Sequence, residues 1–315
     1  MINVKDMGAI GDGVADDTAA IQSAINAHKA VYLPEGIYNI TSELVITNSS
    51  QKIYGDGWTS KIKCASINAI RVTPMDDVGG MILKDFSIVG TPLNGIFIDL
   101  DAPNTVYLRE SMIDHIYCEQ TIEQCIKLIN TNKTNGYFTS SIVNCRLMGG
   151  INLLRAGDSL HIDKNTISGL GHGINISFVP GASMTQITRN NVTSTDYGLI
   201  LGDAPTKVRI AYNHFEKWQA NSVYSDYHVL LSGSPTNYGL DCELIGNSIS
   251  PIGHAYHALG LYCMARTYIN NNIIYDTGNT VNSIYLLPNA SETFFGKRNI
   301  ITGPLIDQGQ NTAWE

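Results

Sequence analysis

Acidic, histidine and aromatic side chains gather in two long segments of the C-terminal half, where they could act on a sugar polymer. The segments are residues 214–228 and 254–257. Most glycosidases place two carboxylates at the scissile bond, one protonating the leaving oxygen and the other activating water or attacking the sugar. We therefore predict Glu216 and Asp226 as catalytic residues, with Asp196 as a further catalytic candidate.

The aromatic and histidine side chains of the same segments are predicted to bind the substrate. Aromatic rings offer flat apolar faces for sugar rings, and a phenol or imidazole adds a hydrogen-bonding edge. The alternative is that the rings only pack these segments against the fold while the acids face solvent. The predicted substrate-binding residues are Trp218, Tyr224, Tyr227, His228, His254, Tyr256 and His257.

A second group of polar segments suits a different reaction. Residues 99–103, 155–158 and 203–207 combine aspartates with Arg155 or Lys207. In a polysaccharide lyase, a cation neutralises the uronate carboxylate while a base removes the adjacent proton. The repeated Asp-Ala-Pro also fits a plain turn preference, so a structural role for these segments stays open.

The elements that must position these residues are repeats. An apolar strand, then Asn or Asp, then another apolar residue recurs along the chain at intervals of 21 to 34 residues. A period of roughly 25 residues indicates a solenoid, in which each repeat stacks on the one before it. The corner residues are Asp85, Asp114, Asn144, Asn165, Asn190, Asn213, Asn247, Asn272 and Asn299.

Each repeat contains a second short apolar strand, often opened by glycine, as in residues 173–176 and 198–201. The strands alternate with period two, so one face of each points inward. This pattern predicts an all-β fold, a single-stranded parallel β-helix of about ten coils. Asparagine suits the corner because it tolerates the left-handed region, and stacked asparagines can pair side chain to side chain.

Long loops in adjacent coils explain why the two segments named first should form one wall. The usual gap between a corner residue and the second strand is seven to twelve residues. It is 16 residues from Asn213 to Val229 and 14 from Asn247 to Leu261. Because loops at the same corner of successive coils lie above one another, we expect these two to meet.

Composition limits the partners. The formal net charge is −8 and the sequence pI is about 5.4, which argues against nucleic acid or an anionic membrane. No apolar run approaches the ~18 residues of a membrane span, and residues 1–6 show no signal-peptide core. The six cysteines lack metal-binding spacing and are predicted to be buried. No cofactor is predicted, although calcium shared between loops stays open.

The first 46 residues differ from the rest and are predicted to cap the solenoid. A short amphipathic helix carries Ile21, Ala24 and Ile25 on one face, and Asp16 and Asp17 are expected to serve its N-terminus and the preceding turn. Such a helix hides the first coil from water and from edge pairing. We predict one domain over residues 1–315, with the cap at 1–46 and the coils at 47–315.

The opening resembles that of the pectate-lyase-like superfamily, found on phage tail spikes and some polysaccharide hydrolases. The similar stretches are residues 4–13, 16–22, 31–38 and 54–57. The resemblance implies a right-handed parallel β-helix, action on polysaccharide and assembly as a homotrimer. It does not transfer catalytic residues, since members place them on different coils. Residues 171–173 resemble the Gly-His-Gly of polygalacturonases, but that family's Asn-Thr-Asp and Asp-Asp elements are absent at suitable spacing.

Taken together, these features predict a polysaccharide depolymerase that cleaves a complex glycan, either capsular, O-antigen or pectin-like. We expect a hydrolase with two carboxylates, extracellular or virion-associated, for which a phage tail spike is one setting. The alternatives are a lyase acting on uronate-containing glycan and a non-catalytic carbohydrate-binding or structural fibre. Convergence of two carboxylates would distinguish the enzyme from the fibre.

Overall fold

The computed structural model describes residues 1–48, 50–74, 78–101, 107–131, 136–169, 173–194, 196–217, 227–251, 257–275 and 282–314 of the 315-residue chain. The side chains of Val78, Pro251 and Asn282 are not among those described. The chain divides into two compact units, Met1–Ala156 and Gly157–Glu315.

The N-terminal unit begins with the predicted cap. Helix α1 (Thr18–Ala27) buries Ile21, Ala24 and Ile25, as its apolar stripe indicated. Asp17 precedes the helix, but its carboxylate accepts hydrogen bonds from the backbone amides of Ile10 and Gly11 at 2.6 and 3.1 Å. Asp17 therefore stabilises the loop around residues 10 and 11 that precedes the helix. The other cap elements are β1 (Ile2–Asn3), η1 (Val4–Met7) and β2 (Asp12–Asp16).

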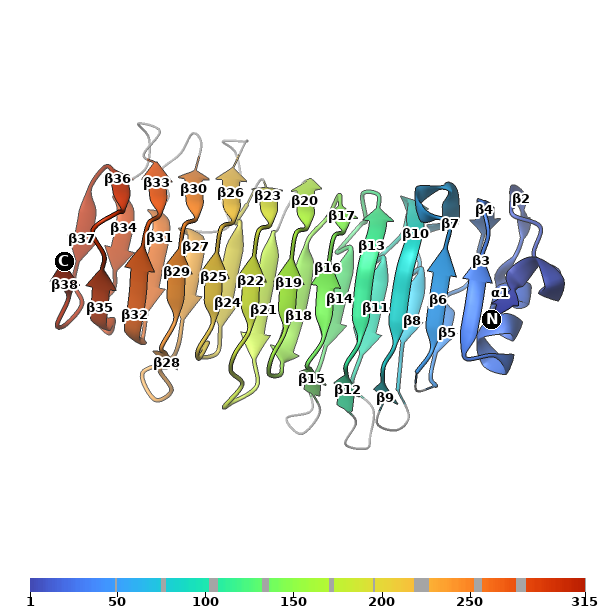
Figure 1. The fold of residues 1–315 in the computed structure, drawn as a ribbon, viewed down its shortest axis with the longest axis horizontal. Helices are drawn as coiled ribbons and strands as arrows, with labels where there is room; N and C mark the ends of the chain where they lie inside the picture. Colours follow the sequence, from blue (N-terminus) through green and yellow to red (C-terminus); the bar gives the residue numbers. More distant parts are fainter. Residues whose placement is uncertain are drawn as a thin grey trace. The chain divides into compact units, whose positions relative to one another are not determined.

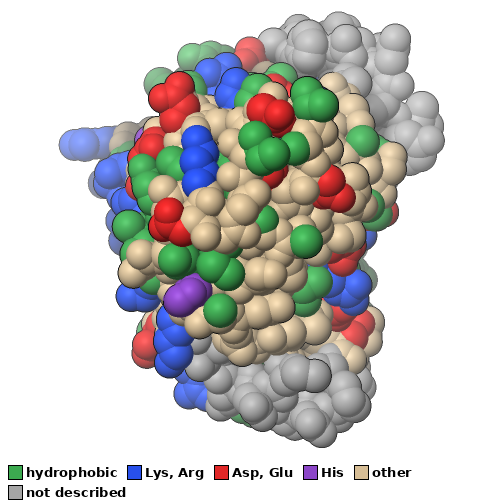
Figure 2. All heavy atoms as spheres, turned by 90° about the vertical axis from the view of Figure 1, so that its right-hand side faces the viewer, with side chains coloured by type: hydrophobic (Ala, Val, Ile, Leu, Met, Phe, Trp, Pro, Cys, Tyr) green, Lys and Arg blue, Asp and Glu red, His purple; other side chains and the backbone are tan. Residues whose placement is uncertain are grey.

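The surface at this end of the unit is mixed. Figure 2 looks onto it and shows apolar, acidic and basic side chains interspersed among polar groups. Beneath the cap, Val31 and Leu33 of the first coil are fully buried. The helix thus covers apolar groups that the open end of a solenoid would expose.

Three columns of parallel strands run through the coils of the N-terminal unit (Figure 1), and a short further column is formed by β9, β12 and β15. Inward residues stack in columns, such as Leu44, Ile70 and Ile96 of three successive coils. The first strands are β3 (Ala30–Leu33), β6 (Lys52–Gly55), β10 (Ile82–Thr91), β13 (Met112–Cys118) and β16 (Ser141–Val143). The second are β4 (Gly36–Asn39), β7 (Ser60–Ala65), the later halves of β10 and β13, and β17 (Arg146–Leu147). The third are β5 (Leu44–Ile46), β8 (Ile70–Val72), β11 (Ile96–Asp99), β14 (Ile126–Ile129) and β18 (Ile151–Ala156).

The C-terminal unit repeats the same three-stranded coil. Ile174, Leu199 and Val229 form one of its fully buried columns. The first strands are β19 (His161–Asp163), β22 (Gln186–Thr188), β25 (Arg209–Ala211), β29 (Glu243–Ile245), β32 (Met264–Asn270) and β35 (Ser291–Phe295). The second are β20 (Thr166–Gly169), β23 (Asn191–Ser194), β26 (His214–Lys217), β30 (Ser248–Pro251), β33 (Ile273–Tyr275) and β36 (Ile300–Thr302). The third are β21 (Ile174–Phe178), β24 (Leu199–Gly202), β27 (Tyr227–Ser232), β31 (His257–Tyr262), β34 (Asn282–Leu286) and β37 (Leu305–Asp307).

A buried asparagine ladder runs through the C-terminal unit at the corner between first and second strands. Asn190 donates from Nδ2 to Oδ1 of Asn213 at 2.9 Å, and Asn213 donates to Asn247 at 3.0 Å. The predicted side-chain pairing is confirmed. In this unit the left-handed backbone falls on the preceding residue, such as Arg189 (φ 55°) or Tyr212 (φ 59°), whereas in the N-terminal unit the predicted corner residues Asp85 (φ 59°) and Asn144 (φ 55°) adopt it themselves. The full ladder is Asn165, Asn190, Asn213, Asn247, Asn272 and Asn299.

The all-β, right-handed parallel β-helix with a capping helix is therefore confirmed, with three strands in a coil where the sequence showed at least two. All six cysteines are buried and free. Throughout the described residues, helices are too short or too polar to cross a bilayer. The single-domain boundary stays a prediction. The remaining elements are η2 (Gly57–Thr59), β9 (Val78–Gly79), β12 (Tyr107–Arg109), β15 (Gly136–Phe138), β28 (Gly239–Leu240) and β38 (Ala313–Trp314).

Candidate functional site

An aromatic group lies on the outer face of the third strands of the C-terminal unit. Tyr227 of β27, His257 of β31 and Tyr285 of β34 form it, and we call it the Tyr–His–Tyr cluster. Tyr227 and His257 are partners in the strand register. The ring centroids of Tyr227 and His257 are 5.0 Å apart, and those of His257 and Tyr285 are 4.8 Å apart. Strands from three coils thus bring the three rings together.

Gly260 explains why the cluster can close. A Cβ atom on Gly260 would lie 2.3 Å from Cδ1 of Tyr227, so the phenol ring lies directly against the glycine backbone. Tyr285 is the register partner of Gly260 and comes within 6.4 Å of Tyr227, centroid to centroid. Its hydroxyl donates to Oε1 of Gln308 at 3.3 Å. Any larger residue at position 260 would displace Tyr227 from the other two rings.

This arrangement has two chemical capacities. Rings at tilts of 30° to 58° present faces and edges suited to a sugar ring. Imidazole and phenol can also take or give a proton, and histidine does so near neutral pH. The cluster is therefore suited both to bind a glycan and to move a proton on it.

Three ionisable side chains are buried in the coil that carries Tyr227 and in the coil before it. Asp196, Lys217 and His228 have exposed fractions of 4%, 1% and 1%. Burial lowers the pKa of Lys217, against the opposing effect of Asp196. Burial, with the nearby Lys217 charge, lowers the pKa of His228 to about 3. His228 is therefore neutral across the physiological range, and the ring sits 3.1 Å from where a Cβ on Gly198 would be.

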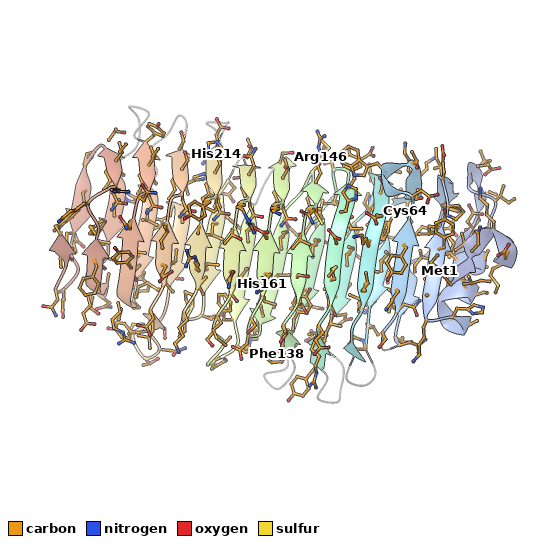
Figure 3. The ribbon with its side chains drawn as sticks, viewed as in Figure 1. Met1, Cys64, Phe138, Arg146, His161 and His214 are labelled. Carbon is orange, nitrogen blue, oxygen red and sulfur yellow. The ribbon has the colours of Figure 1, made fainter. Side chains whose placement is uncertain are left out.

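The structure separates two of the predicted catalytic residues. Glu216 lies on the outer face of β26, with Oε2 3.7 Å from Nε2 of His214 (labelled in Figure 3). Lys217 follows it and points inward, where Asp196 acts on its charge. Because successive side chains of a strand point to opposite faces, Glu216 faces away from Lys217. Asp226, the intended partner of Glu216, lies outside the described residues.

The predicted substrate-binding residues are only partly described. Tyr227 and His257 meet in the cluster, as expected from the register of the two long loops. His228 is buried, which removes its ring from contact with a ligand. Sequence reasoning missed Tyr285 and Lys217. The signal that could have pointed to Tyr285 is its register partner Gly260, which has no side chain and leaves room for the Tyr227 ring. Four predicted substrate-binding residues lie outside the described residues: Trp218, Tyr224, His254 and Tyr256. His172, the histidine of the Gly-His-Gly stretch, also lies outside them.

The segments weighed for a lyase act as turns where they are described. Asp203 and Arg155 have left-handed backbones, with φ of 58° and 55°. Asp158 accepts a hydrogen bond from the backbone amide of Ser183. Asp99 forms an ion pair with Arg71. The carboxylates of Asp99, Asp101 and Asp158 are each engaged in holding a turn or a neighbouring coil.

The N-terminal unit carries its own charged strip on the outer face of the third strands. Arg71 of β8, Phe97 of β11 and Lys127 of β14 are register neighbours. The Arg71 guanidinium lies 5.5 Å from the Phe97 ring centroid, and the Lys127 ammonium 5.9 Å. Both cations are already paired, Arg71 with Asp99 and Glu43, and Lys127 with Glu123, so neither charge is left for a ligand. Among the described residues, no three His, Cys, Asp or Glu side chains gather as a metal-binding group.

Comparison with known proteins gives relatives of the same architecture. Mannuronan C5-epimerase AlgE1 of Azotobacter vinelandii is 61% identical over 44 residues, 12% of this chain. The chain covers only 3% of the length of that relative. The A-module of mannuronan C5-epimerase AlgE4 superposes with a TM-score of 0.68 at 16% identity, over 99% of both chains. Tailspike protein 3 of bacteriophage CBA120 superposes at 0.62 with 14% identity, over 100% of this chain and 57% of that one.

Membership follows from a longer match. The sequence model described as rhamnogalacturonase A/epimerase, pectate lyase-like, matches residues 1–223, which is well over half of the chain. The matched stretch includes the cap and the coils that lead into β26. The chain therefore belongs to the rhamnogalacturonase A/epimerase, pectate lyase-like family.

Proposed function

We propose that this chain is a carbohydrate-active enzyme that removes the C5 proton of a uronate residue in a polysaccharide. The observation that carries the proposal is the Tyr–His–Tyr cluster, in which His257 lies 5.0 Å from the Tyr227 ring and 4.8 Å from the Tyr285 ring. A uronate C5 proton is acidified by the adjacent carboxyl group, so one well-placed base and a neutralised carboxylate suffice to remove it. His257 is the proposed base.

Two outcomes share this first step. Return of a proton to the opposite face of C5 gives epimerisation and leaves the chain intact. Expulsion of the C4 oxygen, protonated as it leaves, breaks the glycosidic bond and forms a C4–C5 double bond. Tyr227 and Tyr285 lie on either side of His257 and are the proposed proton donors. Support comes from the AlgE1 relative, which is named for C5 epimerisation of mannuronan, and from the pectate lyase-like family itself.

A hydrolase that uses two carboxylates is the second candidate. Glu216 favours it, because this carboxylate is accessible and has His214 at 3.7 Å. Strand β26 leads directly into the segment that contains Asp226. If this pair cleaves the glycan, Glu216→Gln and Asp226→Asn should each lower turnover by ~10²-fold or more with folding unchanged.

The deciding experiment follows each reaction separately on alginate, pectate and neutral dextran. In D₂O, the proposed reaction puts deuterium at C5, and elimination adds the ultraviolet absorbance of an unsaturated uronate. His257→Ala and Tyr285→Phe should lower the exchange rate by ~10² or more. Tyr275→Phe is the matched control, since Tyr275 is exposed on β33 in the same unit. New reducing ends without C5 exchange would establish the hydrolase, and binding without either reaction would establish a non-catalytic fibre.

We further propose a homotrimer, extracellular or virion-associated. The proposal rests on the family resemblance and on the shared fold with a phage tailspike protein. Outward strand faces repeated from coil to coil provide the flat flank that a closed homo-oligomer requires. Light scattering should give about three times the 34.3 kDa chain mass. A particle of one chain mass at micromolar concentration would count against the trimer.

A further inference from the structure

We propose that the N-terminal unit carries a separate binding site for an acidic oligosaccharide, formed by Trp58, Tyr117 and Arg146 and the cavity beside them. This site lies on the second strands of the unit, whereas the Tyr–His–Tyr cluster lies on third strands of the other unit. The proposed site binds its ligand without a chemical reaction. Its existence does not depend on the reaction proposed for the Tyr–His–Tyr cluster.

The aromatic part of the site is exposed and held in place from below. Trp58 belongs to η2 and is 47% exposed, an unusual position for a large apolar side chain. Its carbonyl accepts a hydrogen bond from Oγ of Ser87 at 3.1 Å. Tyr117 is the register partner of Ser87, and its ring centroid lies 5.4 Å from that of Trp58 at 36°. The two rings therefore form a fixed, solvent-facing surface of the kind on which sugar rings pack.

Arg146 adds a positive charge to this surface. It is the register partner of Tyr117 on β17, and its guanidinium lies 5.9 Å from the Tyr117 centroid and 6.0 Å from that of Trp58 (Figure 3). Within the described part of the chain, Arg146 forms no ion pair. An exposed guanidinium fixed over aromatic rings offers a two-pronged donor for a ligand carboxylate.

The nearby acids are already engaged, so they leave this charge to a ligand. Asp85 pairs with Nδ1 of His115 at 2.6 Å. Asp114 pairs with Lys84 at 2.7 Å, and the Glu119 carboxylate accepts from the Gly90 amide at 3.0 Å. Asp85 and Asp114 thus have partners that carry or can take a positive charge, whereas the amide partner of Glu119 does not neutralise its carboxylate at the cavity. The site therefore favours a ligand that places a carboxylate at Arg146 and uncharged hydroxyl groups at the cavity.

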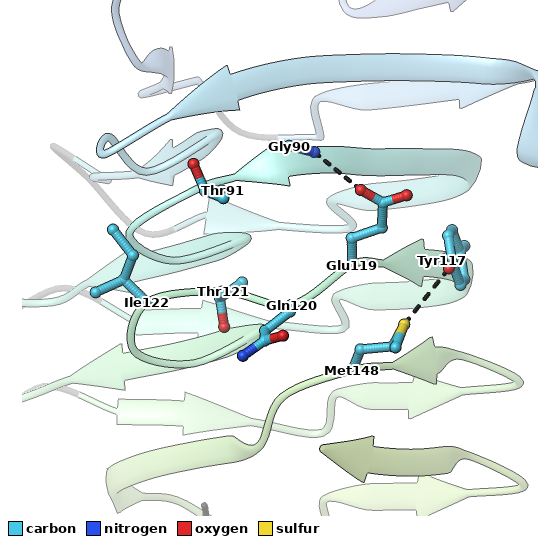
Figure 4. A pocket seen from close by; sticks show the side chains of 8 residues that line it. All are labelled: Gly90, Thr91, Tyr117, Glu119, Gln120, Thr121, Ile122 and Met148. Atoms are coloured by element: carbon cyan, nitrogen blue, oxygen red, sulfur yellow. Dashed lines mark hydrogen bonds between the residues drawn. The ribbon is translucent and has the colours of Figure 1, made fainter. Parts of the chain in front are cut away.

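A cavity of about 620 Å³ adjoins the rings and shares Tyr117 with them (Figure 4). This volume lies in the range of small-ligand pockets, ~300 to 1,000 Å³. The Tyr117 hydroxyl points to Sδ of Met148 at 3.5 Å, which orients the ring at the cavity edge. Hydroxyl and amide groups beside two apolar side chains match the alternating polar and apolar faces of a sugar. The lining residues are Gly90, Thr91, Tyr117, Glu119, Gln120, Thr121, Ile122 and Met148.

Nucleic acid and protein partners fit these observations less well. A phosphate backbone requires many cations along the contact surface, whereas the charge that this site presents to a ligand is that of Arg146. A protein partner would favour a broad apolar patch with a polar rim, whereas this site is a narrow ring pair with one cation and a polar cavity. A carboxylated oligosaccharide uses every part: rings for stacking, Arg146 for the carboxylate, and the cavity for hydroxyls.

The test follows the indole resonance of Trp58 during titration with a hexauronate. The chain has three tryptophans, so three indole N–H signals arise, and Trp58→Tyr identifies the relevant one by its absence. We expect this signal to shift with uronate and to stay in place with a neutral hexasaccharide. Affinity measured at the same signal should fall by ~10-fold or more in Arg146→Gln and recover partly in Arg146→Lys.

Two controls keep the proposal falsifiable. Arg209→Gln removes an equal charge from an arginine already paired with Glu243 at 3.3 Å, and it should leave the titration unchanged. His257→Ala should abolish the proposed C5 exchange but leave the Trp58 shift intact. The proposal is overturned if the Trp58 signal does not move with uronate, or if Arg146→Gln and Arg209→Gln behave alike. It is also overturned if the neutral hexasaccharide binds equally well.

Discussion

Replacing Asn213 by alanine should be one of the most destabilising single changes in the C-terminal unit. Asn213 is 2% exposed, and Oδ1 accepts hydrogen bonds from both the backbone amide and Nδ2 of Asn190, each at 2.9 Å. Its Nδ2 donates to Oδ1 of Asn247 at 3.0 Å and to the carbonyl of Ile187 at 2.8 Å. Alanine removes all four bonds and interrupts the ladder between two coils.

The magnitude follows from the donors left buried without an acceptor. The amide of Asn190 and one of the hydrogens on its Nδ2 lose Asn213, while the other Nδ2 hydrogen keeps the carbonyl of Ile162 at 2.9 Å. Each orphaned donor costs about 1–3 kcal/mol, so the loss is about 2–6 kcal/mol. With a urea m-value of about 3 kcal/mol/M, a loss of about 4 kcal/mol lowers the unfolding midpoint by roughly 1.3 M.

The matched control is Asn191→Ala, at the first residue of β23 and next to the ladder residue Asn190. Asn191 is exposed, so its removal should change stability by no more than about 0.5 kcal/mol. Circular dichroism during urea unfolding gives both midpoints. Equal midpoints for Asn213→Ala and Asn191→Ala would refute the view that the ladder stabilises the coils.

Three further predictions concern the buried core and its ionisable groups. Leu199→Asp places an unpaired charge in a fully buried column, so the variant should fail to fold. The same change at Ile174 or Ile210 should have the same effect. Soluble, folded protein for all three variants would contradict the strand register. The pKa of His228 is about 3 in the folded state, below its unfolded value of ~6.5, so between these limits the unfolded state binds the extra proton. Stability should therefore be complete above pH ~6.5 and fall as the pH drops towards 3, and the urea midpoint of His228→Gln should depend less on pH. The six buried thiols, of which Cys64 is held at a pKa of about 12 by burial, should react with a thiol reagent only after unfolding, and rapid reaction of the native protein would argue against their burial.

Much of the fold could be predicted because a solenoid repeats its constraints. Each coil must bury the same positions, so the asparagines and apolar residues recur at one place in every coil. The position of the left-handed backbone in the C-terminal unit could not be predicted in this way, although Asp85 and Asn144 of the N-terminal unit adopt it as expected. Lys164, Arg189 and Tyr212 share that conformation without sharing side-chain chemistry. At this position the fold constrains the backbone conformation, while the side chain faces outward and can vary. The residue type therefore does not predict the left-handed conformation.

The cap shows a different limit. Asp16 and Asp17 stand where helix N-caps are expected, and the sequence correctly indicated a structural role. Asp16 serves the helix N-terminus by accepting from the amide of Thr18 at 3.0 Å, and Asp17 serves the preceding turn by accepting from the amides of Ile10 and Gly11; the sequence did not show which aspartate takes which role. Two neighbouring acceptors compete for nearby donors, and the turn geometry around residue 11 decides between them. Local sequence alone does not fix that geometry.

The candidate sites show why register matters more than local motifs in this fold. The lengths of two loops indicated Tyr227 and His257 as candidate site residues. Tyr285 lies within a short, regular strand, where no local sequence feature indicates a site. Tyr285 belongs to the cluster only because the register places it beside Gly260, whose missing side chain lets Tyr227 lie flat. A small residue in one coil thus makes room for an aromatic residue of the coil before it.

The second proposed site also depends on strand register and on a small residue. Trp58, Tyr117 and Arg146 come from different coils, and no two are close in the sequence. Ser87 stands in the same outward column as Tyr117, and as a small residue it leaves space for η2 to lay the Trp58 ring over the strand. Lengthening the side chain at position 87, as in Ser87→Lys, should therefore displace Trp58 and abolish its response to uronate while the inward column stays intact. A binding surface in a parallel β-helix is thus specified by its small residues as much as by the large ones that contact the ligand.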